Sequence, residues 1–134
     1  MNNKEIVKKF NKEVIEQTNY ETFKTLMHPE FINHTAPPTA NGAEGMWYTF
    51  HTILKPAFPD LVVEIEDQIE ENDKVVTRKI IRGTHLGKLF DFEPTGKSIK
   101  INIIDIVRIK DGQYFEHWGI NTLQSLLSEL KQGK

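Results

Sequence analysis

The chain has 134 residues, of which 38% are hydrophobic and 27% charged, and its formal net charge at pH 7 is −2. This size and composition predict one soluble globular domain over residues 1–134, large enough to bury a core without crosslinks. Charges this balanced and interspersed argue against a nucleic acid or a membrane as partner, and the absence of cysteine excludes disulfides and thiolate sites. No apolar run is long enough for a signal peptide or a membrane span, so we expect a cytoplasmic protein.

Three segments in the first half of the chain have the spacing of amphipathic helices. Apolar residues recur at helical intervals among charged ones at residues 6–14, 20–27 and 42–57. The segment 20–27 ends before Pro29, because the residue that precedes a proline is disfavoured in helical geometry, and residues 31–34 lead from there into a proline turn. We therefore expect three helices that pack their apolar faces on one core.

From residue 61 the apolar period changes to two, which is the pattern of β-strands with one buried face. A strand that starts there, a tight turn at residues 72–73 and a second strand over 74–84 form a hairpin in which apolar residues face one another. We expect an ion pair of Asp67 with Arg78 on the apolar face, which makes Arg78 a candidate for a pocket wall. The same register predicts two further facing pairs: Ile65 with Ile80 and, on the reverse face, Glu66 with Lys79.

The stretch from Ile99 to Asn121 predicts a second hairpin, which we expect to be the central element of the fold. Its first half alternates with period two, and the single defect on the apolar face is a carboxylate, Asp105. The Asp-Gly pair at 111–112 is a strong hairpin signal. Counting back from that turn puts Asp105 opposite Trp118, and a one-residue slip would put His117 there instead. A carboxylate inside a sheet is costly unless something satisfies or uses it, so we expect the floor of a pocket.

The remaining segments complete the expected fold. Residues 85–97 form a long connection, and such loops often serve as lids or binding loops. Leucines at helical spacing after Asn121 mark a last helix, for which Asn121 is a candidate N-cap. Helices first, then antiparallel strands, then a short helix predict an α+β fold, in which N-terminal helices close a cone-shaped, curved antiparallel sheet around an apolar pocket.

Four residues near the second hairpin are candidates for a site. Asp105 is either a pocket acid or a structural carboxylate that neighbouring donors satisfy. Asn121 either caps the last helix only or also holds a substrate oxyanion. His117 could lie in the core, in the pocket or at a subunit interface. Trp118 could be a core aromatic residue or a platform for a ligand.

The other histidines and the serines bear on three further possibilities: the mouth of the pocket, a metal site and a serine hydrolase. His34 and His85 are candidates for the mouth of the pocket, although each is also consistent with a plain loop residue. The five histidines show no HxH or HExxH element, so we expect no metal site. Neither Ser98 nor Ser125 lies in a GxSxG elbow, which argues against a serine hydrolase.

Several short motifs occur in a fixed order between residues 28 and 130. They are Gly42-Ala43-Glu44-Gly45, Phe58-Pro59-Asp60-Leu61, Gly83-Thr84-His85, Pro94-Thr95-Gly96-Lys97, Ile104-Asp105, Arg108-Ile109-Lys110-Asp111-Gly112 and Glu116-His117-Trp118, followed by a leucine-rich helix. In this series the chain resembles the SnoaL-like polyketide cyclases and predicted ester cyclases of the nuclear transport factor 2-like superfamily. The resemblance implies a cone-shaped α+β barrel, a pocket that uses no cofactor and a dimer formed through the sheet.

The resemblance also implies a reaction. Characterised cyclases of this family close a ring by intramolecular aldol condensation, with an acidic residue as general acid and base. The resemblance places that acid at the position of Asn121, where this chain has an amide. An amide can hold an oxyanion but does not exchange a proton at neutral pH.

Two classes of function are therefore open. The first is a cofactor-free cyclase, isomerase or dehydratase that acts on a small apolar or polyketide-like carbonyl compound. In this hypothesis Asp105 is the base, its pKa raised by burial, with His34 or His117 as partner, while Asn121 and Trp118 orient the carbonyl group. The second is a non-catalytic module that binds a small ligand in the same pocket.

A homodimer is also expected. Ile104, Ile106 and Phe115 are predicted to lie on the sheet face opposite Asp105, and Ile81 is assigned to the same outer face. An antiparallel sheet with only solvent behind it should not carry so many large apolar residues there. We therefore expect two copies of the chain to pack through this face.

Overall fold

The structure is a computed structural model that describes residues 1–132. The three expected helical segments are present in its first half, where two of them widen into π-helical turns. The segments are α1 (Asn3–Lys9) continued by η1 (Phe10–Glu16), α2 (Tyr20–Leu26), and α3 (Ala43–Tyr48) continued by η3 (Thr49–Leu54) and α4 (Lys55–Ala57), with a short turn η2 (Pro38–Ala40) before α3. Their apolar faces are buried, which confirms the helical periodicity.

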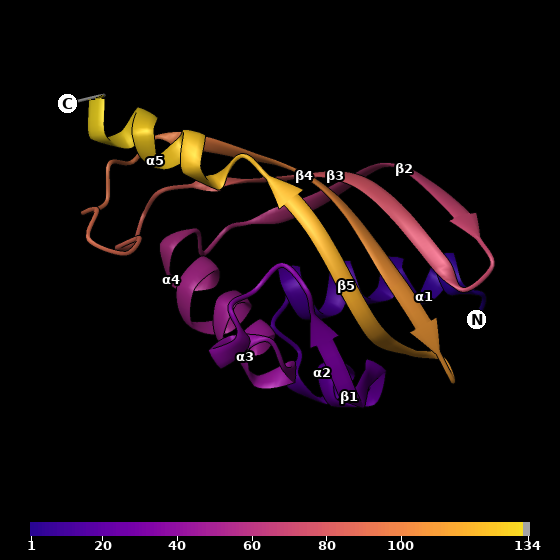
Figure 1. The fold of residues 1–134 in the computed structure, drawn as a ribbon. Helices are drawn as coiled ribbons and strands as arrows, with labels where there is room; N and C mark the ends of the chain where they lie inside the picture. Colours follow the sequence, from indigo (N-terminus) through magenta and orange to yellow (C-terminus); the bar gives the residue numbers. More distant parts are fainter. Residues whose placement is uncertain (133–134) are drawn as a thin grey trace.

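The second half of the chain supplies most of a five-stranded sheet and a last helix. The strands lie in the order β1 (Met27–Asn33), β5 (Gln113–Asn121), β4 (Ser98–Lys110), β3 (Lys74–Thr84) and β2 (Val62–Glu71), and α5 (Leu123–Gln132) follows β5. The sheet curves without closing, and the N-terminal helices cover its concave face (Figure 1). The predicted α+β fold is confirmed. No helix within residues 1–132 is long and apolar enough to cross a membrane.

The strand β1 corrects the expectation that residues 31–34 are only a connection. It pairs in parallel with β5, so the sheet is mixed and not wholly antiparallel. Pro29 lies inside this strand, which is possible because β1 is at the edge of the sheet, where a missing N–H breaks no ladder. This pairing brings the residues after β1 next to the end of β5.

The turn between β4 and β5 is confirmed, but the register beyond it is not. Asp111 and Gly112 both adopt positive φ, as a two-residue hairpin turn of this type requires. Three residues after Gly112, Phe115 has no facing partner in β4 and forms a β-bulge, which shifts every later pair by one residue.

The bulge decides which side chains of β5 reach the concave face. Asp105 faces Gly119, so the predicted pairing with Trp118, and the alternative pairing with His117, are both wrong. The shift turns His117 towards the helices and Trp118 to the outer face, by which we mean the sheet face away from the helices. A register count from the turn alone could not detect this, because a bulge reverses the facing of all residues beyond it.

The ion pair between Asp67 and Arg78 is confirmed in β2 and β3. Arg78 donates to the Asp67 carboxylate from Nε at 3.2 Å and from a terminal nitrogen at 3.1 Å. Both side chains, however, are more than half exposed on the outer face. The pair therefore lies on the opposite face of the sheet from the one predicted, where Arg78 borders a separate hollow together with Asn102 and Ile104. An exposed ion pair of this kind contributes little to stability.

A second bulge, at Glu66 in β2, changes the other predicted pairs. Ile65 faces Lys79 instead of Ile80, and Glu66 is left without a facing partner. The strand β3 is apolar on both faces, so its alternation does not show which face is inward. The structure turns Lys79 to the concave face, where only 4% of the residue is exposed.

Candidate functional site

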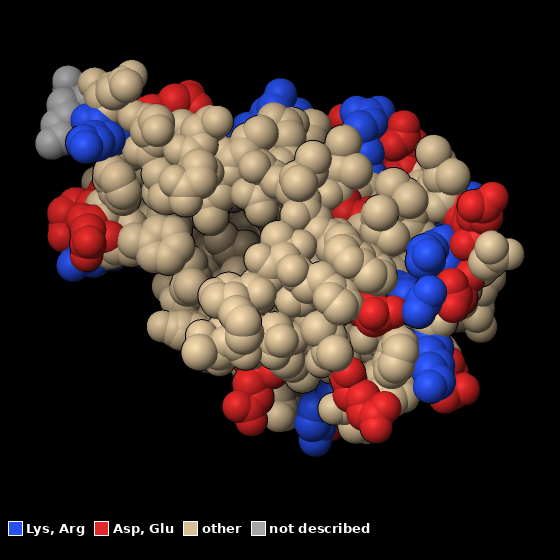
Figure 2. All heavy atoms as spheres, viewed as in Figure 1, with Lys and Arg blue, Asp and Glu red and all other residues tan. Residues whose placement is uncertain are grey.

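A cavity of about 220 Å³ lies between the concave face of the sheet and the helical layer. Figure 2 shows a hollow between the start of α5 and the helices, surrounded by residues that are neither basic nor acidic. Most of the lining is apolar and includes Phe10, Met46, Phe50, Ile81, Ile101 and Ile103. One side is polar, and we call it the polar wall: it consists of Lys79 from β3, Asp105 from β4, and His117 and Asn33 from β5 and β1.

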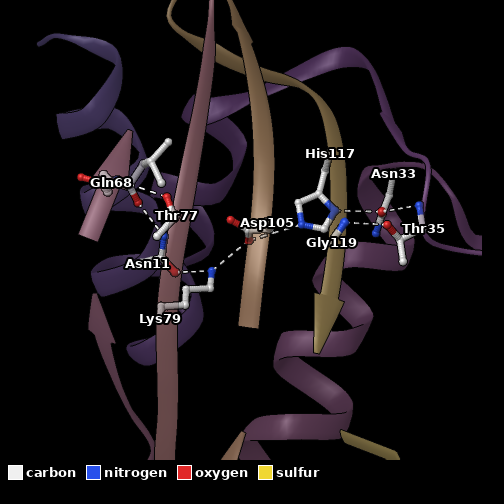
Figure 3. Close-up of polar contacts among 10 residues, drawn as sticks. Asn11, Asn33, Thr35, Gln68, Thr77, Lys79, Asp105, His117 and Gly119 are labelled. Carbon is white, nitrogen blue, oxygen red and sulfur yellow. Dashed lines mark hydrogen bonds and ion pairs between the residues drawn. The ribbon is translucent and has the colours of Figure 1, made fainter. Parts of the chain in front are cut away.

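Asp105 and Lys79 form a buried ion pair in the polar wall. Lys79 Nζ lies 3.2 Å from Asp105 Oδ2, and both side chains are at least nine-tenths buried. Lys79 also donates to Asn11 Oδ1 at 2.6 Å, and the Asn11 amide in turn donates to the Val7 carbonyl at 2.8 Å (Figure 3). The N-terminal helix therefore holds the ammonium group against the sheet.

The environment of Asp105 sets its charge. Burial raises the pKa of the Asp105 carboxyl, but the charge of Lys79 and the hydrogen bond from His117 outweigh burial, so its pKa lies below the usual value. The expectation that burial would raise this pKa towards that of a general base is wrong, because it did not foresee Lys79. Asp105 is a carboxylate at neutral pH, and its Oδ1 has no hydrogen-bond partner among residues 1–132.

His117 connects Asp105 to β1. Its Nδ1 lies 2.9 Å from Asn33 Oδ1, and its Nε2 lies 3.4 Å from Asp105 Oδ2. The Thr35 backbone N–H donates to the same Asn33 oxygen, which identifies that atom as an acceptor. His117 Nδ1 must therefore carry a proton. On the other side of the ring Nε2 faces a carboxylate oxygen, so His117 lies between two acceptors, Asn33 Oδ1 and Asp105 Oδ2.

Gly119 leaves room for this pair. A Cβ atom at this position would lie 3.0 Å from His117 Cε1 and 3.3 Å from its Nε2, and 3.3 Å from Asp105 Cβ. Gly119 is fixed in turn by its backbone N–H, which donates to Thr35 Oγ1 at 2.7 Å. Any side chain here would push the imidazole away from the carboxylate, which explains a glycine directly opposite Asp105.

Comparisons with known proteins identify the family of this chain. The family model for SnoaL-like polyketide cyclases matches residues 5–130. The chain belongs to the SnoaL-like polyketide cyclase family. No curated protein matches the sequence.

Solved structures agree with the family in fold. IdmH of Streptomyces antibioticus, described as a proposed polyketide cyclase, is 25% identical with a TM-score of 0.84, and the match covers 98% of this chain and 99% of that one. A proposed polyketide cyclase of Acidithiobacillus ferrooxidans is 25% identical with a TM-score of 0.85, covering 98% and 96%. AclR of Streptomyces galilaeus, described as a proposed hydroxylase, has a TM-score of 0.81 at 20% identity, covering 97% and 81%, and shares the fold.

Asn121, at the position where the SnoaL-like family was expected to have its acid, lines the cavity. Its Oδ1 accepts a hydrogen bond from the Leu123 backbone N–H at 2.9 Å, so its side chain does cap α5. The helix begins at Leu123, however, so Asn121 lies one residue before the N-cap position predicted for it. The side-chain amide nitrogen has no partner among the described residues and is the donor left for a ligand.

Three predicted site residues of this SnoaL-like chain lie away from the cavity. Trp118 is on the outer face, opposite Ile106, and its ring stacks on the imidazole of His34 with centroids 4.8 Å apart. His34 Nε2 lies 2.8 Å from the Glu116 carboxylate. Arg78 is on the outer face with Asp67. The structure thus separates these residues from Asp105, and it selects His117 instead of His34 as the histidine beside that acid.

His85 is the first residue of the 85–97 connection. Its side chain is fully buried and does not line the cavity. Its Nδ1 accepts a hydrogen bond from the Thr95 backbone N–H at 3.3 Å and lies 3.0 Å from Thr95 Oγ1. Its ring packs against Phe58, with centroids 5.9 Å apart. His85 therefore anchors this connection to the core, and burial lowers its pKa below the usual value.

This lowered pKa predicts an acid-sensitive loop. The unfolded chain binds a proton at His85 below about pH 6.5, whereas the folded chain resists it, so the stability contributed by His85 is present above that pH and is lost as the pH falls. We expect His85→Gln to reduce the loss of melting temperature between neutral and mildly acidic pH, measured by circular dichroism. His51→Gln, at an exposed position, should keep the wild-type slope, and equal slopes for all three proteins would contradict the prediction.

Lys79 and Asn33 are site residues that sequence reasoning missed. The register predicted from the sequence puts Lys79 on the reverse face opposite Glu66, and the sequence pattern puts Asn33 in a connection. The signal that could have identified Lys79 is that it is the single charge on the strand face it shares with Val75, Thr77 and Ile81. Within residues 1–132, no three His, Asp, Glu or Cys side chains are grouped so as to hold a metal ion.

Proposed function

We propose that this SnoaL-like protein is a cofactor-free enzyme that transfers a proton at the carbon next to a carbonyl group. Such transfers underlie aldol cyclisation, isomerisation and dehydration alike. The observation that carries the proposal is the pair of Asp105 and His117 in the wall of an apolar cavity. This pair can donate and accept a proton, and a ligand bound in the cavity would displace most of the water around it.

The geometry supports a division of roles different from the one expected from the sequence. Asp105, ionised beside Lys79, is a weak base; it orients the His117 ring and would stabilise the positive charge that forms there when His117 accepts a proton. His117 is the better group for the proton transfer, because the unperturbed pKa of histidine lies near neutral pH. The contact between Nε2 and Asp105 is long for a charge-assisted hydrogen bond, which leaves this nitrogen accessible to a ligand. The Asn121 amide is placed to donate to a carbonyl oxygen.

The cavity limits the substrate. Its volume of about 220 Å³ is below the range of roughly 300–1,000 Å³ that is common for pockets that hold drug-sized ligands. Together with the apolar lining, this supports a substrate with one or two rings or a short chain, and with its polar group at one end. That end would lie against the polar wall.

The proposal is tested by isotope exchange, which needs no knowledge of the natural substrate. The purified protein is incubated in deuterated water with 2-indanone, 2-tetralone or ethyl acetoacetate, and loss of the α-proton signals is followed by NMR. We expect saturable exchange well above the rate in buffer for at least one compound. If compounds bind, as detected by saturation-transfer NMR, but show no accelerated exchange, the proposed enzymatic function is refuted.

The second candidate function, a non-catalytic module that binds a small ligand, is favoured by one observation. The position expected to hold the acid of the family carries Asn121, whose oxygen is engaged at the start of α5. In that function the polar wall would only recognise the ligand. The isotope experiment separates the two functions, since both predict binding and only the enzyme predicts exchange.

We also propose that two copies pack through the outer face of the sheet. Ile104 is 44% exposed there, and the half-buried Ile106 lies near it. The earlier assignment of Ile81 to this face is wrong, because Ile81 lines the cavity. Phe115 already contacts His28 and Lys110 within the chain, so it is a poor test residue.

Ile104→Glu is therefore expected to convert a dimer into a monomer, because it places a charge in the centre of an apolar interface. Light scattering at micromolar concentration measures the result. Leu86→Glu, at an exposed position in the 85–97 connection, serves as the control and should leave the mass unchanged. A wild-type protein that is already monomeric would refute the proposed dimer.

A further inference from the structure

The hydrogen-bond donors that line one side of the cavity outnumber its anionic groups. Lys79 and His117 both direct a nitrogen at Asp105 Oδ2, and Asp105 is the one carboxylate among the lining residues. Tyr114 adds no negative charge, since burial raises the pKa of its phenol well above the usual value. Two side chains therefore share one carboxylate oxygen.

Lys79 also has donor capacity that the protein does not use. An ammonium group has three N–H donors, and Lys79 directs two of them to Asn11 and Asp105. The third has no partner among residues 1–132. Lys79 and His117 both approach the same oxygen, Asp105 Oδ2, at 3.2 and 3.4 Å, whereas charge-assisted N–H···O bonds are usually about 2.7–2.9 Å long. The carboxylate therefore satisfies neither side chain fully.

Burial strengthens the attraction of these unused donors for an anionic group. Lys79 is 4% exposed, and the side of the cavity away from the polar wall is apolar, so water cannot screen the ammonium group as it does on a surface. An anionic group of a ligand would receive the third N–H of Lys79 and would share Nε2–H of His117. Asp105 repels such a group, but the ammonium charge of Lys79 offsets this repulsion and its third N–H adds a charge-assisted hydrogen bond.

We propose that the cavity recognises a carboxylate: its ligand is a small apolar molecule with a carboxylate group at one end, held by Lys79 and His117. The proposal rests on the proposed function only in placing the ligand in the same cavity, and it adds the chemical class of the substrate. Lys79 is then the residue that determines specificity, and the apolar lining receives the body of the ligand.

The test compares carboxylates with their neutral amides of the same shape. Phenylacetate, 3-phenylpropionate and 1-naphthoate are each paired with the corresponding amide, and the dissociation constants for the wild-type protein are measured by calorimetry at neutral pH. We expect at least one carboxylate to bind about tenfold or more tightly than its amide, as is typical for hydrogen bonds to charged groups. Equal affinity, a preference for the amides, or no saturable binding of any carboxylate at millimolar concentration would overturn the proposal.

Two variants locate the effect. Lys79→Gln keeps a donor and removes the charge, so it should reduce the preference for the carboxylate to within a few fold. Arg78→Gln makes the same change of charge one residue away, on the outer face, and should keep the full preference. Loss of preference in Arg78→Gln, or its retention in a folded Lys79→Gln, would overturn the assignment. The comparison in the wild type remains decisive if Lys79→Gln does not fold.

The outcome is distinguishable from failure of the proposed function. If the protein prefers carboxylates but does not accelerate α-proton exchange, carboxylate recognition is supported and the enzymatic function is refuted. If it exchanges α-protons of neutral ketones but binds both members of each pair equally, the enzymatic function is supported and carboxylate recognition is refuted.

Discussion

Lys79→Met should lower the free energy of unfolding by about 3–5 kcal/mol, the range typical for removing one member of a buried ion pair. The variant keeps the length and the apolar stem of the side chain, so packing changes little. It leaves Asp105, 5% exposed, without its neighbouring ammonium group, and Asn11 without the donor to its side-chain oxygen. Urea unfolding followed by circular dichroism measures the effect.

The double variant Lys79→Met/Asp105→Leu is the control for this interpretation. Replacing both members of a buried pair by apolar residues is often neutral, so the double variant should recover most of the stability. Arg78→Met breaks the exposed pair with Asp67 and should cost no more than about 1 kcal/mol. If Lys79→Met and Arg78→Met cost the same, or if the double variant is less stable than Lys79→Met, the ion pair does not have the assigned role.

His117→Gln should reduce the rate of α-proton exchange by about 10²–10⁴-fold, the usual loss when a positioned acid or base is removed. Glutamine can still hydrogen-bond to Asn33 and Asp105 but does not titrate. Binding of the ketone should therefore stay within a few fold, so that kcat falls while the dissociation constant is nearly unchanged. NMR measures both quantities on the same samples.

His34→Gln is the matched control for the histidine experiment. His34 is the other histidine that sequence reasoning considered as a partner of Asp105, and it lies on the outer face against Trp118 and Glu116. Its substitution should leave exchange within a few fold of the wild type. Equal losses in the two variants would mean that the effect does not come from the polar wall.

The helices and the fold class could be predicted from the sequence because their signals are local and repeat many times. A period of 3.6 over residues 6–14 or 42–57 is sustained by several buried side chains, and one exception does not change it. The turn at Asp111-Gly112 has equally specific chemistry. The strand β1 carried no such signal, since it is short, contains Pro29, and owes its strand geometry to β5, more than eighty residues later.

Which face of the sheet each side chain occupies was predicted less well, because two β-bulges interrupt the strands. The bulges at Phe115 and Glu66 each insert one residue, and nothing in the local sequence shows where a ladder takes up an extra residue. A single insertion exchanges the two faces for the whole rest of the strand. This is why Asp105 was placed correctly on the concave face while Trp118 and Arg78 were not.

The neighbours of Asp105 were beyond sequence reasoning because they come from distant parts of the chain. Lys79 is held by Asn11, 68 residues before it, and His117 by Asn33, 84 residues before it. The charge state of Asp105 depends on these contacts. A pKa argued from burial alone therefore had the wrong direction.

The parallel pairing of β1 with β5 also has a consequence for the order of folding. Hairpins such as β2–β3 and β4–β5 close short loops and can form early, whereas β1 must wait for a partner at the far end of the sequence. Asn33 and Thr35 reach His117 and Gly119 only once that edge strand has docked. The imidazole is thus orientated in one of the last steps, and a chain whose sheet is otherwise complete would still have an unassembled polar wall.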